Sequence, residues 1–297
     1  MPGEFDFIDW LRAQHRANDL VTVPQGDDLA VLKWPTGELL LVGVDQVLDG
    51  IHFDSAIHPP RMIGRKVMNR NLSDCAAMAC LPAAAVVAAA LPANVGLEYA
   101  KELYLGIREA GEKFGCVIVG GDTGSWPGKL ALSVTILGRN GGIQPITRKG
   151  AKAGDGIYVT GALGGSILGR HMTFEPRVQL ARELAQTGRI SAMIDLSDGL
   201  SRDLGHICQQ SGVGAVIDAA AVPLHADAKE LSRRDGRDAL EHALHDGEDY
   251  ELLFTASSDF KAPSAVRIGT IVQEPGIWLS RGDQREKLTP LAWQHTL

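Results

Sequence analysis

The chain lacks the features that mark several classes of protein. It has no long run of lysine or arginine, and its formal net charge of −7 removes the electrostatic basis for nucleic-acid binding. Its first residues contain no apolar signal-peptide core, and its longest apolar run, residues 81–92, is too short to span a bilayer. These absences predict a soluble, cytoplasmic protein with no nucleic-acid or membrane partner.

Cysteine is scarce, and signatures of nucleophilic catalysis are missing. The four cysteines are Cys75, Cys80, Cys116 and Cys208. They form no CxxC pair and no zinc-ligand spacing, which favours free thiols in a reducing compartment. The sequence also contains no G-x-S-x-G or HExxH element. We therefore expect no side-chain nucleophile.

The two common phosphate-binding patterns, G-x-x-x-x-G-K-[ST] and G-x-G-x-x-G, are absent as well. Glycine-rich turns at 119–124 and 160–166 would let backbone N–H groups approach an anion, although such turns are common. If this chain binds phosphate, metal bridging must supply much of the attraction.

What the chain does have is length, apolar residues and alternating elements. Its 297 residues, 45% of them hydrophobic, suffice for two cores of about 150 residues each. The glycine-rich segment 139–155 interrupts the pattern, so we place the domains at 1–142 and 143–297. Hydrophobic periodicity predicts helices at 4–14, 60–79, 96–115, 197–210 and several further helices up to about residue 186. Strands are expected at 29–34, 38–45, 83–91, 116–122, 129–139, 156–161, 191–195, 214–218 and 250–255. This alternation indicates a mixed α/β or α+β protein.

Carboxylates collect where these strands end. They are Asp27, Asp28, Asp45, Asp74, Asp122, Asp195, Asp198, Asp246, Glu248 and Asp249. Any single one is more simply a turn residue. Several converging carboxylates would repel one another by roughly 4 kcal/mol per pair at about 4 Å, so their convergence would require a cation. Magnesium is the natural candidate because it prefers hard oxygen ligands and is often shared with substrate phosphates.

The segment MIDLSDGLSRDLGHI at 193–207 places three aspartates at a strand end and a helix start. Ser197 or Asp198 could cap the helix, while Asp195 and Asp198 could share one cation. A similar Leu-Ser-Asp triplet occurs within 71–79, which places Asp74 at a corresponding position. Both interpretations remain open at this level.

A set of short motifs in order carries a resemblance to a known family. They are GDDLAVL, VDQVLDGIHF, NLSDCAAMA, VGGDT, TRKGAKAGD, YVTGALGGS, IDLSDGLSRDLGHI and GEDYELLFT. Together they resemble the thiamine-monophosphate kinase family, of the aminoimidazole ribonucleotide synthetase and selenophosphate synthetase superfamily. The resemblance implies a two-domain aminoimidazole-ribonucleotide-synthetase-like fold whose N-terminal domain forms a β-barrel across a homodimer. It also implies ATP held with several Mg²⁺ ions at the domain junction.

The resemblance assigns roles to residues by position. The implied metal ligands are Asp28, Asp45, Asp74, Asp122, Asp195 and Asp198. The implied ATP contacts are Tyr104, Gly121, Arg148 and Ser197. The implied thiamine monophosphate contacts are His52, Glu248 and Trp293. On this interpretation the 193–207 segment is a metal and nucleotide site that also caps a helix.

The sequence departs from the family pattern at Gly43-Val44-Asp45, where the family usually reads Ser-Thr-Asp. Loss of the hydroxyl at Val44 would weaken a metal site if the hydroxyl is used. Valine also suits a buried strand end, in which case Val44 simply packs. His52 likewise is either a ligand contact or a structural loop histidine.

Three functional hypotheses follow. The first is an ATP- and Mg²⁺-dependent kinase that converts thiamine monophosphate to thiamine diphosphate by direct in-line transfer. The second keeps the fold but uses another small phosphorylated or carboxylated acceptor. The third is a non-catalytic nucleotide-binding protein. We also expect a homodimer, because the apolar strands 83–91 and 129–137 offer more surface than one small sheet covers.

Overall fold

The computed structural model describes residues 10–11, 13–14, 18–23, 31–93, 95–261 and 264–289. The chain forms two compact units by its internal contacts. The first comprises Met1–Cys75 and Cys80–Gly142, and the second comprises Ala76–Ala79 and Ile143–Leu297. Within the described residues, no helix is long and apolar enough to cross a membrane.

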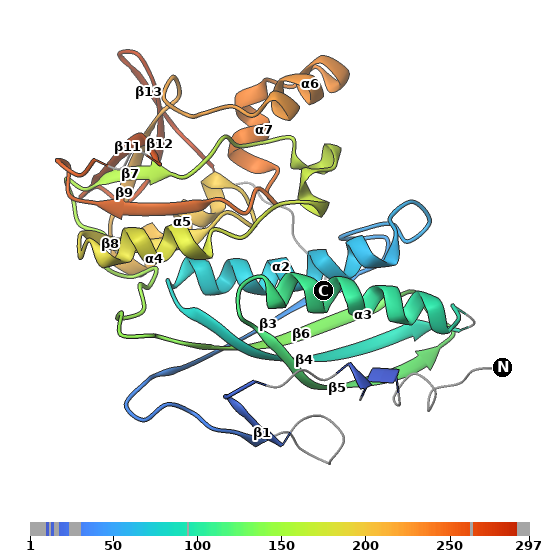
Figure 1. The fold of residues 1–297 in the computed structure, drawn as a ribbon. Coiled ribbons are helices and arrows are strands. Elements are labelled where there is room, and N and C mark those ends of the chain that lie inside the picture. The colour runs from blue at the N-terminus through green and yellow to red at the C-terminus, as the bar shows by residue number, and fades with distance from the viewer. Residues whose placement is uncertain are drawn as a thin grey trace. The chain divides into compact units, whose positions relative to one another are not determined.

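The first unit is built on a four-stranded sheet with the order β3-β6-β4-β5 (Figure 1). Its elements are β1 (Val21–Val23), β2 (Val31–Leu32), β3 (Leu40–Leu48), α2 (Pro60–Ala77), β4 (Leu81–Pro92), α3 (Leu97–Glu112), β5 (Val117–Trp126) and β6 (Ala131–Arg139). Strand β6 pairs antiparallel with both β3 and β4, while β4 and β5 are parallel. A separate two-stranded ribbon joins β1 and β2.

One face of this sheet is covered by α2 and α3 (Figure 1). The alternation along β6 shows which face that is, because Leu132, Val134 and Ile136 are buried while their neighbours are partly exposed. The two helices approach closely at two glycines. A Cβ on Gly64 would lie 2.1 Å from the carbonyl oxygen of Leu103, and one on Gly106 would lie 2.0 Å from that of Arg61. No larger residue fits at this crossing.

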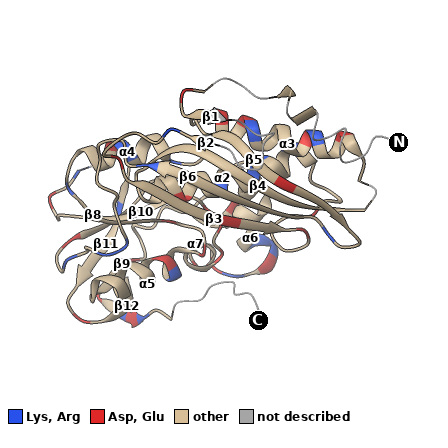
Figure 2. Cartoon of the chain, turned by 90° about the horizontal axis from the view of Figure 1, so that it is seen from below, with Lys and Arg blue, Asp and Glu red and all other residues tan. Residues whose placement is uncertain are grey.

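The opposite face of the sheet exposes several apolar side chains. Along β3, Leu40, Val42 and Val44 alternate with residues that face the helices, and they are 53%, 63% and 66% exposed. The strand register places Val44 beside Thr135 of β6, which in turn lies beside the exposed Val86 of β4. Figure 2 shows these strands mostly tan, with few charged positions. We call Leu40, Val42, Val44 and Val86 the open-face patch.

The second unit contains a seven-stranded sheet with the order β13-β12-β9-β11-β7-β10-β8. Its strands are β7 (Gly156–Val159), β8 (Ile190–Asp195), β9 (Gly214–Asp218), β10 (Leu252–Ala256), β11 (Val266–Val272), β12 (Gly276–Arg281) and β13 (Gln284–Lys287). Its helices are α4 (Val178–Gln186), α5 (Leu200–Ser211), α6 (Ala226–Asp235) and α7 (Ala239–His245), with short 3₁₀ turns at Ser166–Leu168 and Arg170–Met172. Among the described strand pairings of this seven-stranded sheet, only that of β9 with β12 is parallel.

The mixed α/β class expected from the sequence is confirmed, and several elements differ in extent. The strand expected at 116–122 runs to Trp126, and the helix expected from Ser197 begins at Leu200. Strands β11, β12 and β13 were not predicted. The helix expected at 4–14 lies mostly outside the described residues, although 10–11 and 13 are helical.

Candidate functional site

The turn between β8 and α5 carries three of the predicted site residues. Asp195 ends β8 and is buried, Ser197 is half-buried, and Asp198 is exposed. The strand places Asp195 here because Ala192, Ile194 and Leu196 are packed into the core of the second unit. The turn thus presents one buried and one exposed carboxylate within four residues.

The expected capping of α5 by Ser197 or Asp198 is wrong. The helix is preceded by Gly199 at φ 106, and no side chain caps it at that position. Instead Oδ2 of Asp203, inside the first turn, accepts the backbone N–H groups of Asp198 and Gly199, each at 3.1 Å. The buried carboxylate of Asp203 in α5 therefore fixes the backbone of this turn through two hydrogen bonds.

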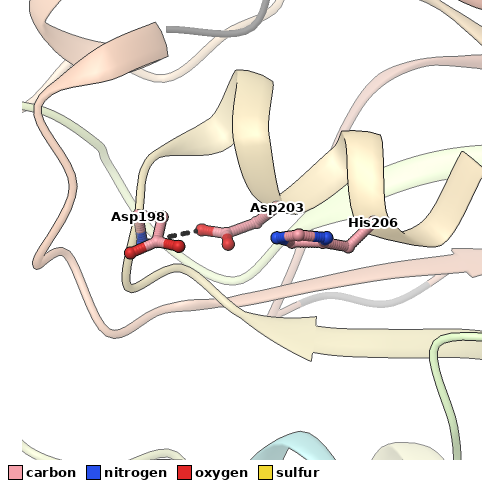
Figure 3. Close-up of side chains that lie close together, drawn as sticks. All are labelled: Asp198, Asp203 and His206. Atoms are coloured by element: carbon pink, nitrogen blue, oxygen red, sulfur yellow. Dashed lines mark hydrogen bonds between the residues drawn. The ribbon is translucent and has the colours of Figure 1, made fainter. Parts of the chain in front are cut away.

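Negative charge is concentrated around this carboxylate. Ligand atoms of Asp198, Asp203 and His206 lie within 4.8 Å of one another (Figure 3). Burial raises the pKa of Asp203 well above its ordinary value, and the charges of Asp195 and Asp198 raise it further. A bound cation would reduce the repulsion among these carboxylates. The pKa of His206 is lowered by burial and then by the charge of Arg148, which is therefore a neighbour of this group.

The predicted substrate residue Glu248 lies on a turn that packs against the Asp195–Gly199 turn. The backbone N–H of Glu248 donates to the carbonyl of Ser197 at 2.8 Å, and that of Tyr250 donates to Leu196 at 2.8 Å. Glu248 and Tyr250 have φ values of 53° and 52°, which non-glycine residues rarely adopt. The second unit therefore brings the turn that carries predicted metal ligands next to the turn that carries the predicted substrate residue Glu248.

Two side chains hold the Glu248 carboxylate in place. Nδ1 of the buried His171 lies 3.1 Å from Oε2, and the Tyr250 hydroxyl donates to Oε1 at 3.2 Å. Phe174 stacks on Tyr250 with ring centroids 3.8 Å apart. Sequence analysis missed His171 and Phe174, because neither belongs to a local motif that points to Glu248.

In the first unit, His52 lies in the loop after β3, and its hydrogen bond defines the tautomer of the ring. Its Nδ1 accepts the backbone N–H of Leu48 at 3.1 Å, so the neutral ring carries its proton on Nε2. The fully buried Lys66 of α2 donates from Nζ to the His52 carbonyl at 2.7 Å. The hydrogen bond from Lys66 therefore ties the His52 loop to α2.

Asp45 and Val44 point to opposite faces of the sheet. Asp45 pairs across the strands with the fully buried Val134, so its side chain is on the helix side. There it meets Arg70 of α2, whose Nε lies 2.5 Å from Oδ2 and whose Nη2 donates to Oδ1 at 3.1 Å. Val44 belongs to the open-face patch. A hydroxyl at position 44 would consequently lie on the face away from the Asp45 carboxylate, and Val44 is not at a buried strand end.

The remaining predicted residues are distributed over the first unit. Asp74 is exposed on α2, Gly121 and Asp122 are exposed on β5, and Tyr104 is on α3. Among the described residues, no group of three possible ligands within 4.8 Å includes Asp45, Asp74 or Asp122. Tyr104 contacts the ring of Trp10 edge to face, with centroids 5.6 Å apart. Asp28 and Trp293 lie outside the described residues.

The fold and the turn geometry define the class of protein. Residues 26–140 match the AIR synthase related protein, N-terminal domain, and residues 152–277 match its C-terminal domain. The chain is 41% identical to a thiamine-monophosphate kinase of Rhodopirellula baltica, over 98% of this chain and 97% of that one. It belongs to the thiamine-monophosphate kinase family.

Two solved structures support this assignment. Thiamine-monophosphate kinase from Stenotrophomonas maltophilia K279a is 33% identical with a TM-score of 0.81, over 93% of this chain and 96% of that one. AaThiL complexed with AMPPCP and TMP is 28% identical with a TM-score of 0.80, over 99% and 97% of the two chains. The sequence-based resemblance and the expected two-domain fold are therefore confirmed.

Proposed function

We propose that this chain transfers the terminal phosphoryl group of ATP to the phosphate of thiamine monophosphate, forming thiamine diphosphate and ADP. The observation that supports this most directly is the packing of the Asp195–Gly199 turn against the Glu248 turn. One turn offers carboxylates suited to a metal–nucleotide complex, and the other offers a carboxylate suited to the cationic thiamine ring. The homologue AaThiL is complexed with AMPPCP and TMP, which supports a nucleotide and a phosphorylated acceptor as the two ligands.

The donor chemistry of the second unit fits Mg²⁺. Asp195 and Asp198 provide hard oxygen ligands. Burial raises the pKa of the neighbouring Asp203, and the negative charges of Asp195 and Asp198 raise it further. Mg²⁺ bound there would neutralise the phosphate charges and align the reacting oxygens. We further propose that Asp28, Asp74 and Asp122 act as metal ligands. Asp45 has a different environment, because its carboxylate pairs with Arg70.

The remaining residues have proposed roles in binding and orientation. Arg148 would compensate nucleotide charge, with Tyr104, Gly121 and Ser197 completing the ATP contacts. On the acceptor side, His52 would donate from Nε2, while Trp293 would pack against the thiamine. Glu248 would face the positively charged ring, held by its hydrogen bond from Tyr250. Because a phosphate monoester is already largely ionised near neutral pH, positioning and charge neutralisation suffice without a strong general base.

Direct transfer is supported by the state of the candidate nucleophiles. All four cysteines are buried, and burial raises the pKa values of Cys116 and Cys208 to about 12. A thiolate at either position is therefore scarce at neutral pH. The free thiols also suit the reducing cytoplasm, which is the location we propose.

We also propose that the protein is a homodimer in which two open-face patches meet. Three exposed apolar side chains along β3 and the exposed Val86 of β4 lie on one sheet face, which is the kind of surface that a two-fold axis buries. Such a contact would close the two sheets into the barrel expected from the family.

The test is an assay of the full chain with ATP, Mg²⁺ and thiamine monophosphate, followed by chromatographic separation of thiamine diphosphate. The expected result is stoichiometric formation of thiamine diphosphate and ADP, with no product from unphosphorylated thiamine. Glu248→Gln should raise the KM for thiamine monophosphate more than that for ATP. ATP hydrolysis or binding without thiamine diphosphate would contradict the proposal and favour another acceptor or a non-catalytic nucleotide-binding protein.

A further inference from the structure

The clearest disagreement with a simple metal cluster is at Asp45. Both of its carboxylate oxygens face the Arg70 guanidinium, with Nε 2.5 Å from Oδ2 and Nη2 3.1 Å from Oδ1. Oδ1 also accepts the backbone N–H of Gln46 at 2.8 Å. The Asp45 carboxylate therefore already has three donors.

This ion pair is partly buried and well oriented. The side chains of Arg70 and Asp45 are 14% and 25% exposed. Two parallel N–H···O bonds to one carboxylate are the strong, geometrically specific form of an arginine pair, and partial burial reduces screening by solvent. A divalent ion that bound Asp45 would have to displace the guanidinium or lie next to its positive charge. Either arrangement weakens the binding of the divalent ion.

The surroundings of Asp45 differ from those of the carboxylates in the second unit. Asp198 and Asp203 lie within 4.8 Å of each other, so their like charges favour an added cation. Asp45 instead faces a cation that the chain itself supplies. Residue 44 brings no compensating ligand, because the Val44 side chain lies on the open face.

We propose that Arg70 serves as a built-in cation at Asp45, so that Asp45 is not a metal ligand in this chain and the bound metal cluster lacks the ion that Asp45 would otherwise hold. The inference rests on the proposed metal- and ATP-dependent function, and refines which residues of that site hold ions. It also gives Arg70 a role, since a fixed positive charge at Asp45 does part of the work of a metal without depending on metal concentration.

The experiment counts bound Mn²⁺ in the presence of AMPPCP, using the solution EPR signal of free Mn²⁺. Wild type and Asp45→Asn should bind the same number of ions with dissociation constants that agree within about twofold. Arg70→Gln should bind one additional Mn²⁺, or bind its weakest ion at least tenfold more tightly. That gain should disappear in the double variant Arg70→Gln/Asp45→Asn.

Two further variants separate this effect from general changes in charge or folding. Arg61→Gln removes another arginine of α2 that pairs with carboxylates, Glu102 and Glu109, and should leave the ion count unchanged. Arg70→Lys keeps the positive charge and should behave as wild type. Thermal unfolding in EDTA should show that Asp45→Asn is destabilised without metal, which a role restricted to metal binding would not produce.

Loss of one Mn²⁺ in Asp45→Asn alone would overturn the proposal, as would an Arg70→Gln variant whose ion count and weakest dissociation constant both match those of wild type. Wild type that binds no Mn²⁺ with AMPPCP would overturn it together with the metal dependence of the proposed function. Wild type that binds Mn²⁺ with the expected pattern but makes no thiamine diphosphate would contradict only the proposed reaction. The two failures are thus distinguishable.

Discussion

The carboxylate of Asp203 accepts a hydrogen bond from the backbone N–H of Asp198 at 3.1 Å, and Asp203 is almost completely buried. The same oxygen accepts the N–H of Gly199, so one side chain fixes the whole turn on which the proposed ligand Asp198 lies. Leucine at position 203 would leave both donors without this acceptor, at a cost of about 1–3 kcal/mol for each buried group.

The first prediction is therefore that Asp203→Leu destabilises the protein and raises the Mg²⁺ concentration needed for half-maximal activity by at least tenfold. Asp203→Asn keeps a side-chain oxygen and should recover much of the stability. A Mg²⁺ titration of activity, together with thermal unfolding in EDTA, checks both effects. An Asp203→Leu variant with the wild-type Mg²⁺ requirement would show that the residue only supports folding.

The second prediction concerns the two Leu-Ser-Asp segments. Asp74→Asn and Asp198→Asn preserve side-chain size but remove a proposed ligand charge, so turnover at limiting Mg²⁺ should fall by orders of magnitude while the fold survives. Asp283→Asn, at an exposed turn of the second unit, removes the same charge and should have no effect. Near-normal activity in either ligand variant would mean that its residue is assigned wrongly.

Sequence reasoning succeeded where the signal is local. The uninterrupted run 81–92 gives a strand, although only 82–85 and Leu91 of it are buried, and the periodic pattern of 97–112 gives an amphipathic helix. The end of β8 at Asp195 was also predictable, because Ser-Asp-Gly after an apolar run favours a turn. These features depend on residues within a few positions of one another.

Contacts between distant residues were not predictable in the same way. Arg70 and Asp45 are 25 positions apart and belong to a helix and a strand whose packing creates the pair. The start of α5 was misplaced for a related reason. A Cβ on Gly199 would lie 3.0 Å from the His245 carbonyl carbon, so a segment remote in sequence fixes this turn and favours glycine there.

The third prediction is a pH dependence of stability that originates at Asp249. Arg170 pairs with this buried carboxylate at 2.9 Å, and both of its oxygens accept the N–H of Gly164. Burial nevertheless raises the pKa of Asp249 from 3.8 to about 7, with the charge of Arg170 opposing the rise. A carboxyl group whose pKa is higher in the folded state stabilises the protein below its unfolded pKa, and this contribution is lost as the pH rises through about 7.

Between pH 4 and pH 8 the loss amounts to roughly 4 kcal/mol at about 1.4 kcal/mol per pKa unit. Asp249→Asn remains neutral throughout, so its stability should vary less over this range. Denaturant unfolding in EDTA at several pH values measures the difference between the two proteins. A constant difference from pH 4 to pH 8 would show that Asp249 does not titrate in this window.

The fourth prediction is sequential kinetics without a phosphorylated enzyme. The cysteines are buried, and the buried histidines at 171, 242 and 245 are paired with acidic side chains. Initial-rate plots against ATP at several thiamine monophosphate concentrations should intersect, as expected when both substrates bind before transfer. Recovery of a stable labelled protein after incubation with γ-labelled ATP alone would contradict direct transfer.

The last prediction tests the open-face patch as a dimer contact. Val44 is 66% exposed, and its cross-strand neighbour Thr135 links it to Val86. A lysine at position 44 would place two like charges near a two-fold axis on an apolar surface, so Val44→Lys should be monomeric by light scattering at micromolar concentration. Val44→Thr has a similar shape and should remain dimeric. Because the residue 44 side chain faces away from the Asp45 carboxylate, we also expect wild-type and Val44→Thr activities to give superimposable Mg²⁺ titration curves.

The matched control is Ile167→Lys, which adds the same charge at a 62% exposed isoleucine of the second unit and should leave the dimer intact. A wild-type protein with the monomer mass would exclude the dimer outright. Dissociation by both lysine variants would instead indicate that added positive charge, rather than its place on the sheet, weakens association. Dissociation by Val44→Lys alone would assign the contact to the open face of the four-stranded sheet, because the two variants differ only in where the charge is placed.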